Sequence, residues 1–204
     1  IAHRLQFYGQ FLLDEFQLSE LTKSRGYWAN KYGIQGGIKY IDAFGMNNLD
    51  LQVEGNRVRP FTYSHYNTIG NYTHYNQPLA HPLGANFQEW IGIMRYQPTS
   101  KLYIKAKAIY YNQGLDSSNV NYGGDIFRDY RTRTMEFGYK IGDALKATCL
   151  NASLLVSYEL RENIFIDASG LYRKYKIQNA VAQKNTSLIT VGLRMNMARR
   201  EYDF

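Results

Sequence analysis

Residues 102–108, Leu-Tyr-Ile-Lys-Ala-Lys-Ala, alternate apolar and polar side chains, and this stretch decides the fold class. Successive side chains of a β-strand point to opposite faces of a sheet. The apolar Leu102, Ile104 and Ala106 therefore share one face, and Lys105 and Lys107 share the other. Strict alternation of this kind predicts a β-strand with one apolar and one polar face.

The same alternation recurs along the chain. Near the C-terminus, Ile189, Val191, Leu193 and Met195 alternate with Thr190, Gly192, Arg194 and Asn196. The segment 86–97 is an exception, since both of its faces carry large apolar residues. Together these patterns predict eight strands, at about 4–14, 27–40, 47–58, 86–97, 102–112, 148–160, 163–177 and 187–198.

The connections between these strands alternate in length. Short turns are expected at 41–46, 98–101 and 161–163, and longer loops at 15–26, 59–85, 113–147 and 178–186. Such an order is typical of an antiparallel up-and-down β-sheet, and several strands reach the ~10 residues that a tilted strand needs to cross a bilayer. We therefore expect an all-β fold, an up-and-down transmembrane β-barrel, with residues 1–204 as one unit.

Composition excludes several other classes. The chain of 204 residues has no run of ~20 apolar residues, which argues against a helical membrane protein, and its 19 Tyr and 10 Phe argue against disorder. The net charge is +7, but Lys and Arg are spread along the whole chain, so nucleic acid is not an expected partner. The single Cys149 excludes an intrachain disulfide. No cofactor is expected.

Alternation alone does not separate a membrane barrel from a soluble β domain, in which the apolar face would point inward. Small residues on the apolar face, such as Gly36, Ala106 and Ala152, fit lipid better than a packed core. The polar face mixes both signs of charge, which could pair across a watery lumen: Lys39, Asp50, Glu54, Lys105, Lys107, Glu159, Asp167 and Arg194. Aromatic residues are predicted at strand ends, as in interfacial girdles: Tyr27, Trp28, Tyr40, Trp90, Tyr96, Tyr110, Tyr158 and Tyr172.

We favour the membrane barrel over the soluble domain. A periplasmic C-terminus would place every short turn in the periplasm and every long loop outside the cell. The terminal Phe204, with Tyr202 before it, is typical of outer-membrane proteins. In an unbroken strand, however, Tyr202 and Phe204 would point to the opposite face of the sheet from Val191 and Leu193. The sequence therefore predicts a bulge or a short tail after the last strand.

Four stretches resemble the C-terminal half of Wzi-like outer-membrane proteins of Bacteroidota, a capsule-assembly family with relatives linked to gliding motility. These are Tyr8-Gly-Gln-Phe-Leu-Leu-Asp-Glu-Phe16, Trp28-Ala-Asn-Lys-Tyr-Gly33, Tyr75-Asn-Gln-Pro-Leu-Ala-His-Pro-Leu-Gly-Ala-Asn86 and Ala198-Arg-Arg-Glu-Tyr-Asp-Phe204. The resemblance implies a barrel of more than eight strands, with more chain before Ile1. By itself, an eight-stranded barrel would be filled by side chains.

Loop 59–85 holds three of the four histidines, His65, His74 and His81. Two of them lie in a near-repeat, Tyr63-Ser-His-Tyr66 and Tyr72-Thr-His-Tyr75. Neither fixed ligand spacing nor a supporting shell is visible, so no metal site is expected. Tyrosine rings stack on sugar faces while His donates hydrogen bonds, so one hypothesis is a glycan-binding platform of Tyr63, His65, Tyr66, Tyr72, His74 and Tyr75. The alternative is a loop folded over the barrel mouth by its own aromatic core.

Loop 113–147 contains the densest cationic cluster, Arg128, Arg131 and Arg133. These side chains could face an anionic polysaccharide or lipopolysaccharide phosphate, and ordinary solvated arginines are the alternative. The carboxylate spacing of an EF-hand is absent.

Two functions follow as hypotheses. The first is a non-enzymatic barrel of the outer membrane that binds or organises surface capsular polysaccharide through long Tyr-rich loops. Its partners would be membrane lipid, lipopolysaccharide, surface polysaccharide and other outer-membrane proteins. The alternative is a structural component of the gliding or protein-secretion machinery. Because no nucleophile motif or pair of acids at a plausible spacing is found, an enzyme is not expected.

Overall fold

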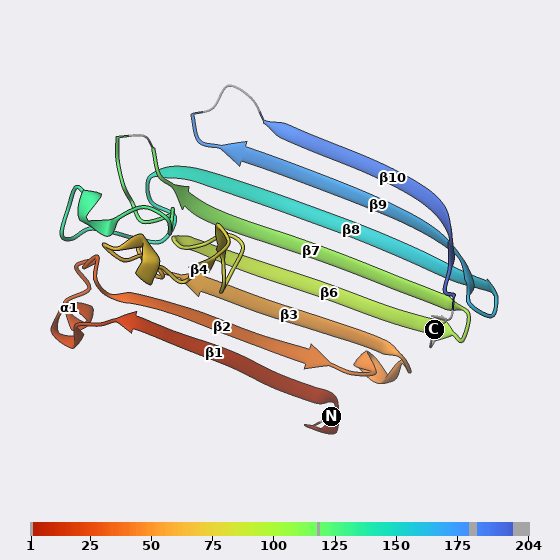
Figure 1. Cartoon of the computed structure of the whole chain (residues 1–204). Coiled ribbons are helices and arrows are strands. Elements are labelled where there is room, and N and C mark those ends of the chain that lie inside the picture. Colours follow the sequence, from red (N-terminus) through yellow and green to blue (C-terminus); the bar gives the residue numbers. More distant parts are fainter. Residues whose placement is uncertain (1, 118, 180–182, 198–204) are drawn as a thin grey trace, which may run out of the picture.

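The computed structural model describes residues 2–117, 119–179 and 183–197. Eight long strands form one antiparallel sheet in which each strand pairs with the next long strand along the chain (Figure 1). The strands are β1 (Leu5–Glu15), β2 (Lys31–Tyr40), β3 (Leu49–Val58), β6 (Phe87–Thr99), β7 (Leu102–Leu115), β8 (Leu145–Arg161), β9 (Ile164–Ile177) and β10 (Lys184–Met195). The all-β class, the up-and-down order and all eight predicted strands are thereby confirmed.

The sheet is open. Its edge strands are β1 and β10, which are not paired with each other in the described residues.

Register places the apolar residues of all eight strands in one continuous band. Ala106 of β7, for example, lies opposite Met94 of β6 and Leu154 of β8. Many of the band's large side chains are exposed, among them Phe7, Phe11, Val53 and Leu193. On β3 and on β6 to β9 the band ends abruptly towards the long loops, where the next residues on the same face are polar: Arg57, Gln88, Asn112, Thr148 and Lys174.

Aromatic side chains mark both limits of this band. Trp90 and Tyr110 lie opposite each other at the limit nearer the loops, and Tyr96 and Tyr158 lie at the other. Gly55 leaves room for the Trp90 ring, because a Cβ there would be 2.9 Å from Trp90 Cζ3. These four residues lie at the limits of the apolar band, where a girdle would place them.

The prediction was wrong for Tyr27 and Trp28. Residues 27–30 precede β2 rather than belonging to it, and Trp28 is only 8% exposed. Its ring packs against Phe61 and its Nε1–H donates to Glu136 Oε2 at 2.8 Å. Trp28 therefore stabilises the packing of the loops, because it contacts a buried aromatic neighbour and donates to a carboxylate there.

The other face of the sheet carries paired charges. Lys39 Nζ lies 3.1 Å from Asp50 Oδ2, and Arg194 Nε lies 2.7 Å from Asp167 Oδ2. Lys105 and Lys107 are partly covered on this face. Opposite charges therefore meet here, as the sequence predicts.

The long loops gather at one end of the sheet and the hairpin turns at the other (Figure 1). Two small elements within these loops are absent from the sequence prediction: helix α1 (Leu18–Thr22) and a hairpin of β4 (Thr73–His74) and β5 (Gln77–Pro78). Both buried apolar clusters involve the loop end, one around Tyr63, Phe87 and Ile126 and one around Trp28, Phe61 and Tyr139. The packed core therefore lies under the loops.

Within the described residues, no helix combines the length and apolarity needed to cross a membrane. The predicted tail at Tyr202 and Phe204 lies outside the described residues.

Candidate functional site

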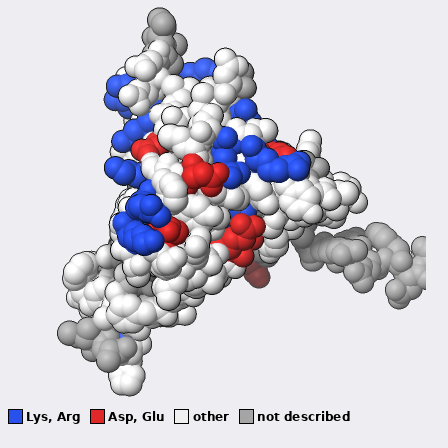
Figure 2. All heavy atoms as spheres, turned by 90° about the vertical axis from the view of Figure 1, so that its left-hand side faces the viewer, with Lys and Arg blue, Asp and Glu red and all other residues white. Residues whose placement is uncertain are grey.

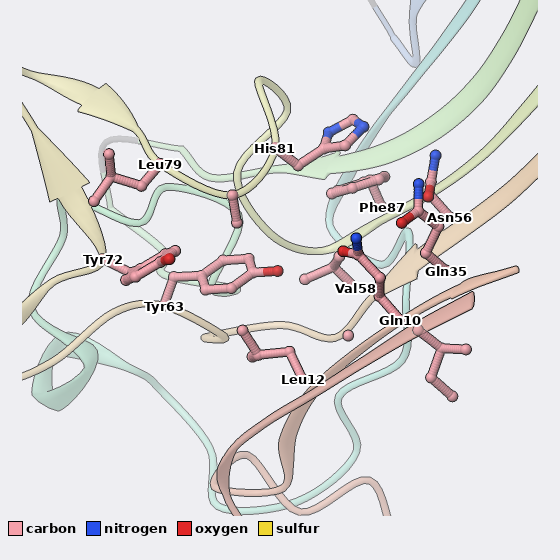
Figure 3. Close-up of a pocket in the computed structure, with 13 residues that line it drawn as sticks. Gln10, Leu12, Gln35, Asn56, Val58, Tyr63, Tyr72, Leu79, His81 and Phe87 are labelled. Atoms are coloured by element: carbon pink, nitrogen blue, oxygen red, sulfur yellow. The ribbon is translucent and has the colours of Figure 1, made fainter. Parts of the chain in front are cut away.

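A cavity of about 340 Å³ lies between loop 59–85 and the polar face of β1, β2, β3 and β6. Figure 3 shows the amides of Gln10, Gln35 and Asn56 on one side, with Tyr63 and Tyr72 on the other. The strands thus contribute polar groups and the loop contributes aromatic rings. The remaining residues that line the cavity are Leu12, Gly33, Ile34, Val58, Leu79, Ala80, His81 and Phe87.

Glu54 is the centre of a hydrogen-bond network next to this cavity. Its carboxylate accepts from Tyr8 Oη at 2.7 Å, Gln35 Nε2 at 2.9 Å and Asn56 Nδ2 at 3.0 Å. Gln52 extends the network by donating to Tyr8 Oη at 2.7 Å. The network therefore holds two lining side chains, Gln35 and Asn56, in place before a ligand binds.

His81 closes the network from the loop side. Its Nε2 lies 3.0 Å from Glu89 Oε2, and its ring stacks on Phe87 at a centroid distance of 4.4 Å. Because the Leu83 N–H donates to His81 Nδ1 at 3.2 Å, the proton of the neutral ring is on Nε2 and is donated to Glu89. Glu89 also accepts from Asn56 Nδ2 at 3.0 Å. Both carboxylates are therefore held by hydrogen bonds, Glu54 by three donors and Glu89 by two.

Tyr63 and Tyr72 are the two candidate glycan residues that line the cavity. Their rings stack at 5.9 Å, with Tyr63 buried and Tyr72 half exposed. Burial raises the pKa of the Tyr63 phenol, so it stays a neutral hydroxyl. Gly33 accommodates this ring, since a Cβ there would be 3.2 Å from Tyr63 Oη.

The other four candidates of loop 59–85 lie outside the cavity. His65 Nε2 is 3.6 Å from Asp14 Oδ1. Tyr66 is exposed, and the Arg131 guanidinium lies over its ring. His74 and Tyr75 form a ring pair at 4.2 Å on the β4–β5 hairpin, where Tyr75 is 88% exposed. The six residues therefore divide between the cavity and the outer surface.

The three arginines of loop 113–147 are bound within the loops. Arg131 makes a bidentate ion pair with Asp129, and Arg133 pairs with Glu136 and lies 4.0 Å above the Trp28 ring. Arg128 Nη1 donates to the Ser117 carbonyl at 2.7 Å. Figure 2 views this end of the molecule and shows Asp and Glu among the Lys and Arg groups. The cluster is thus partly neutralised.

Lys31 links the loops beneath these residues. It is completely buried, with Nζ 3.2 Å from Glu15 Oε1 and donating to the Ser64 carbonyl at 3.0 Å. The same ammonium lies 4.3 Å from the centre of the Tyr130 ring. One residue of β2 therefore contacts both long loops, 59–85 and 113–147.

Sequence reasoning did not identify Gln10, Gln35, Asn56 or Glu89 as site residues. The alternation signal is present for Gln10, Gln35 and Asn56, because each has the parity of its strand's polar face. Glu89 lies in the segment 86–97, where both faces carry large apolar residues. What the sequence lacks is the register in which β3 pairs with β6 across the 28 residues of loop 59–86, which sets Asn56 opposite Glu89. A polar face was predictable, but this particular constellation was not.

The chemistry of the cavity suits a ligand rich in hydroxyl groups. The amides of Gln10, Gln35 and Asn56 offer both donors and acceptors beside flat aromatic rings, a combination that binds sugars. No group of three or more His, Cys, Asp or Glu residues in the described chain is placed to hold a metal ion.

Comparison of the chain with protein-family models, with curated proteins and with solved structures gives no match. Function is therefore inferred from the geometry of this chain.

Proposed function

We propose that this chain is part of an outer-membrane β-barrel that binds surface polysaccharide at its loop end. The observation that carries the membrane location is the arrangement of the two sheet faces. On the apolar face, large side chains are exposed at the middle of the sheet, with Leu154 48% exposed. On the polar face, Glu89 is 5% exposed and hydrogen-bonded. Lipid is the solvent in which such a distribution is stable.

The dimensions of the band agree with this location. From Leu102 to Tyr110 on β7 there are eight residue steps, or about 27 Å along the strand. At a strand tilt of about 40° this spans about 21 Å across a membrane, comparable with the ~25 Å apolar band of outer-membrane barrels. The aromatic residues at the two limits of the band are typical of interfacial girdles. A soluble protein rarely leaves so large an apolar surface uncovered.

Barrel closure is required by the same environment. Lipid cannot satisfy the backbone N–H and C=O groups of an open strand edge. In a membrane, β1 and β10 must therefore be paired, either with each other or with further strands. The resemblance to Wzi-like proteins favours further strands and a larger barrel.

Membrane location is tested by fractionating cells that export the protein and by gel migration with and without boiling. The expected result is recovery in the outer-membrane fraction and a faster-migrating unboiled form. A protein found free in the periplasm with no heat-dependent migration would refute the barrel.

A binding role, rather than catalysis, is favoured by the hydrogen bonds that hold Glu54 and Glu89 within the network beside the cavity. Polysaccharide would contact the exposed rings of the β4–β5 hairpin and place one sugar in the cavity. The separation of cavity residues from outer residues fits a long polymer better than a small molecule, because a polymer can span both.

Polysaccharide binding is tested with immobilised bacterial capsular polysaccharides, neutral and uronate-containing. Tyr72→Ala and Tyr75→Ala should each weaken binding by about three- to tenfold, the equivalent of one lost ring contact. Tyr75→Phe keeps the ring and should bind almost normally. Gln10→Leu tests the cavity without breaking any hydrogen bond recorded for Gln10. Unchanged binding in all three disruptive variants would refute the loop-end site.

A further inference from the structure

A second hollow, also about 340 Å³, lies outside the first cavity on the outward side of the loop end. Helix α1, the ends of β2 and β3 and residues 138–141 enclose it. Arg57 belongs to the outward face of the sheet and lies two residues beyond Gly55, which the Trp90 ring covers. The hollow is therefore immediately next to the limit of the apolar band.

Four of the fourteen residues that line the hollow are basic, and three of these four have no carboxylate partner among the described residues. Arg25 is paired with Glu20, its Nε lying 2.9 Å from Glu20 Oε2. By contrast, Arg57, Arg59 and Lys140 take part in no ion pair with any residue that the structure describes. Three positive charges thus share one hollow with no negative charge assigned to them.

The Arg59 side chain is held in place by two hydrogen bonds, but no carboxylate of the described residues compensates its charge. Its Nε donates to the Asn30 carbonyl at 2.9 Å and its Nη2 donates to the Tyr27 carbonyl at 3.0 Å. Burial lowers the pKa of Arg59, and the neighbouring Arg57 charge acts in the same direction. A bound anion would offset both effects, because it supplies the missing opposite charge.

We propose that this hollow binds the phosphate group of a glycolipid headgroup in the leaflet that the loops face. This inference rests on the membrane location proposed above. Planar guanidinium groups match phosphate oxygens with two parallel hydrogen bonds. A lipid whose chains lie along the apolar band would place its headgroup at the level of Arg57, which favours a lipid phosphate over a soluble acidic polymer.

The hollow differs from the arginine cluster that the sequence suggested for this role. Arg131 and Arg133 each have a carboxylate partner, whereas Arg57 and Lys140 do not. Arg57 also lies on the lipid-facing side of the sheet, while Arg131 lies over Tyr66 of the loop surface. Charge and position therefore both favour the second hollow.

The test uses the full chain purified in detergent and exchanged into phosphatidylcholine vesicles with and without lipid A, whose sugar headgroup carries phosphate monoesters. Retained lipid is measured by native mass spectrometry. Arg57→Gln and Lys140→Gln are the main variants, because neither side chain has a recorded hydrogen bond whose loss would unfold the loops. Each should weaken retention by about tenfold, as expected for one charge-assisted hydrogen bond.

Lys101→Gln, at the opposite end of the sheet, removes the same charge and should retain lipid A normally. Equal loss in this control, or no loss in Arg57→Gln and Lys140→Gln, would overturn the proposal. So would tight binding of inorganic phosphate alone, or of a uronate polysaccharide in place of lipid A. If the protein inserts into vesicles but retains no lipid A, only this inference fails. A protein that does not insert at all contradicts the proposed function instead.

Discussion

The buried Lys31 gives an asymmetric prediction at the scale of single residues. Glu15→Gln leaves the ammonium buried without its counter-charge and should lower the free energy of unfolding by about 2 kcal/mol. Lys31→Met removes the charge itself, and Glu15 is 37% exposed and so remains hydrated. This variant should lose only about 1 kcal/mol, from the hydrogen bond to Ser64. Urea titration in detergent measures both, and a larger loss for Lys31→Met would contradict the ion-pair interpretation.

Glu20 gives a pH-dependent prediction. The hydrogen bonds from Arg25 hold the pKa of the Glu20 carboxyl below its usual range, and Lys23 acts in the same direction. A carboxylate with a depressed pKa stabilises the fold above its unfolded pKa of about 4.3, and this contribution is lost as the pH falls through the lower folded value. Hydrogen exchange of residues 17–26, corrected for intrinsic rates, should therefore accelerate below about pH 4.

The matched control for this experiment is Glu20→Gln, which cannot titrate. Its exchange should already be faster at neutral pH and should show no further change in the acid range. The same acid response in both proteins would assign the effect to another group.

At the scale of a strand, β8 offers neighbouring leucines on opposite faces. Leu154 lies between Ala106 and Gly170 in the apolar band, and Leu155 lies between Lys105 and Ser169 on the polar face. Leu154→Glu should reduce the stability of the membrane-inserted protein by about 1–2 kcal/mol, less than the ~2–4 kcal/mol for Arg or Lys at mid-bilayer. Leu155→Glu gains Lys105 as a neighbour and should change stability little. Folding titrations in lipid vesicles compare them, and equal effects would contradict the lipid-facing assignment.

The β4–β5 hairpin stores strain at its turn. Tyr75 and Asn76 have φ values of 45° and 60°, the left-handed conformation that a two-residue hairpin turn requires. Asn tolerates this region better than other non-glycine residues. Tyr75→Asn and Tyr75→Ala both remove the ring, so Tyr75→Asn should be more stable than Tyr75→Ala by about 1 kcal/mol. Protease resistance of the loop measures this difference, while both variants should lose polysaccharide binding equally. Equal protease resistance of the two variants would refute backbone strain at Tyr75.

Sequence pattern predicted the strands well because alternation is a local signal. The stretch around Ala106 has its period-two pattern whatever it pairs with. The hairpin at Thr73–Pro78 was missed because its pairs span only two residues on each side and Tyr75 is an unusual turn residue. The role of Trp28 was missed because its partners Phe61 and Glu136 are far away in the chain. Long-range loop packing leaves no periodic trace in the sequence.

For the whole molecule, the two tryptophans report on different environments. Trp90 is 52% exposed at the limit of the apolar band, whereas Trp28 is buried among the loops. In Trp28→Phe protein inserted into vesicles, lipids brominated near the headgroup should quench Trp90 more strongly than lipids brominated near the chain ends. Trp90→Phe protein should be quenched by neither lipid, because the fluorescence of Trp28 then comes from within the loops. If instead a water-soluble quencher reaches Trp90 while both lipids fail, the apolar face meets water and the outer-membrane location is refuted.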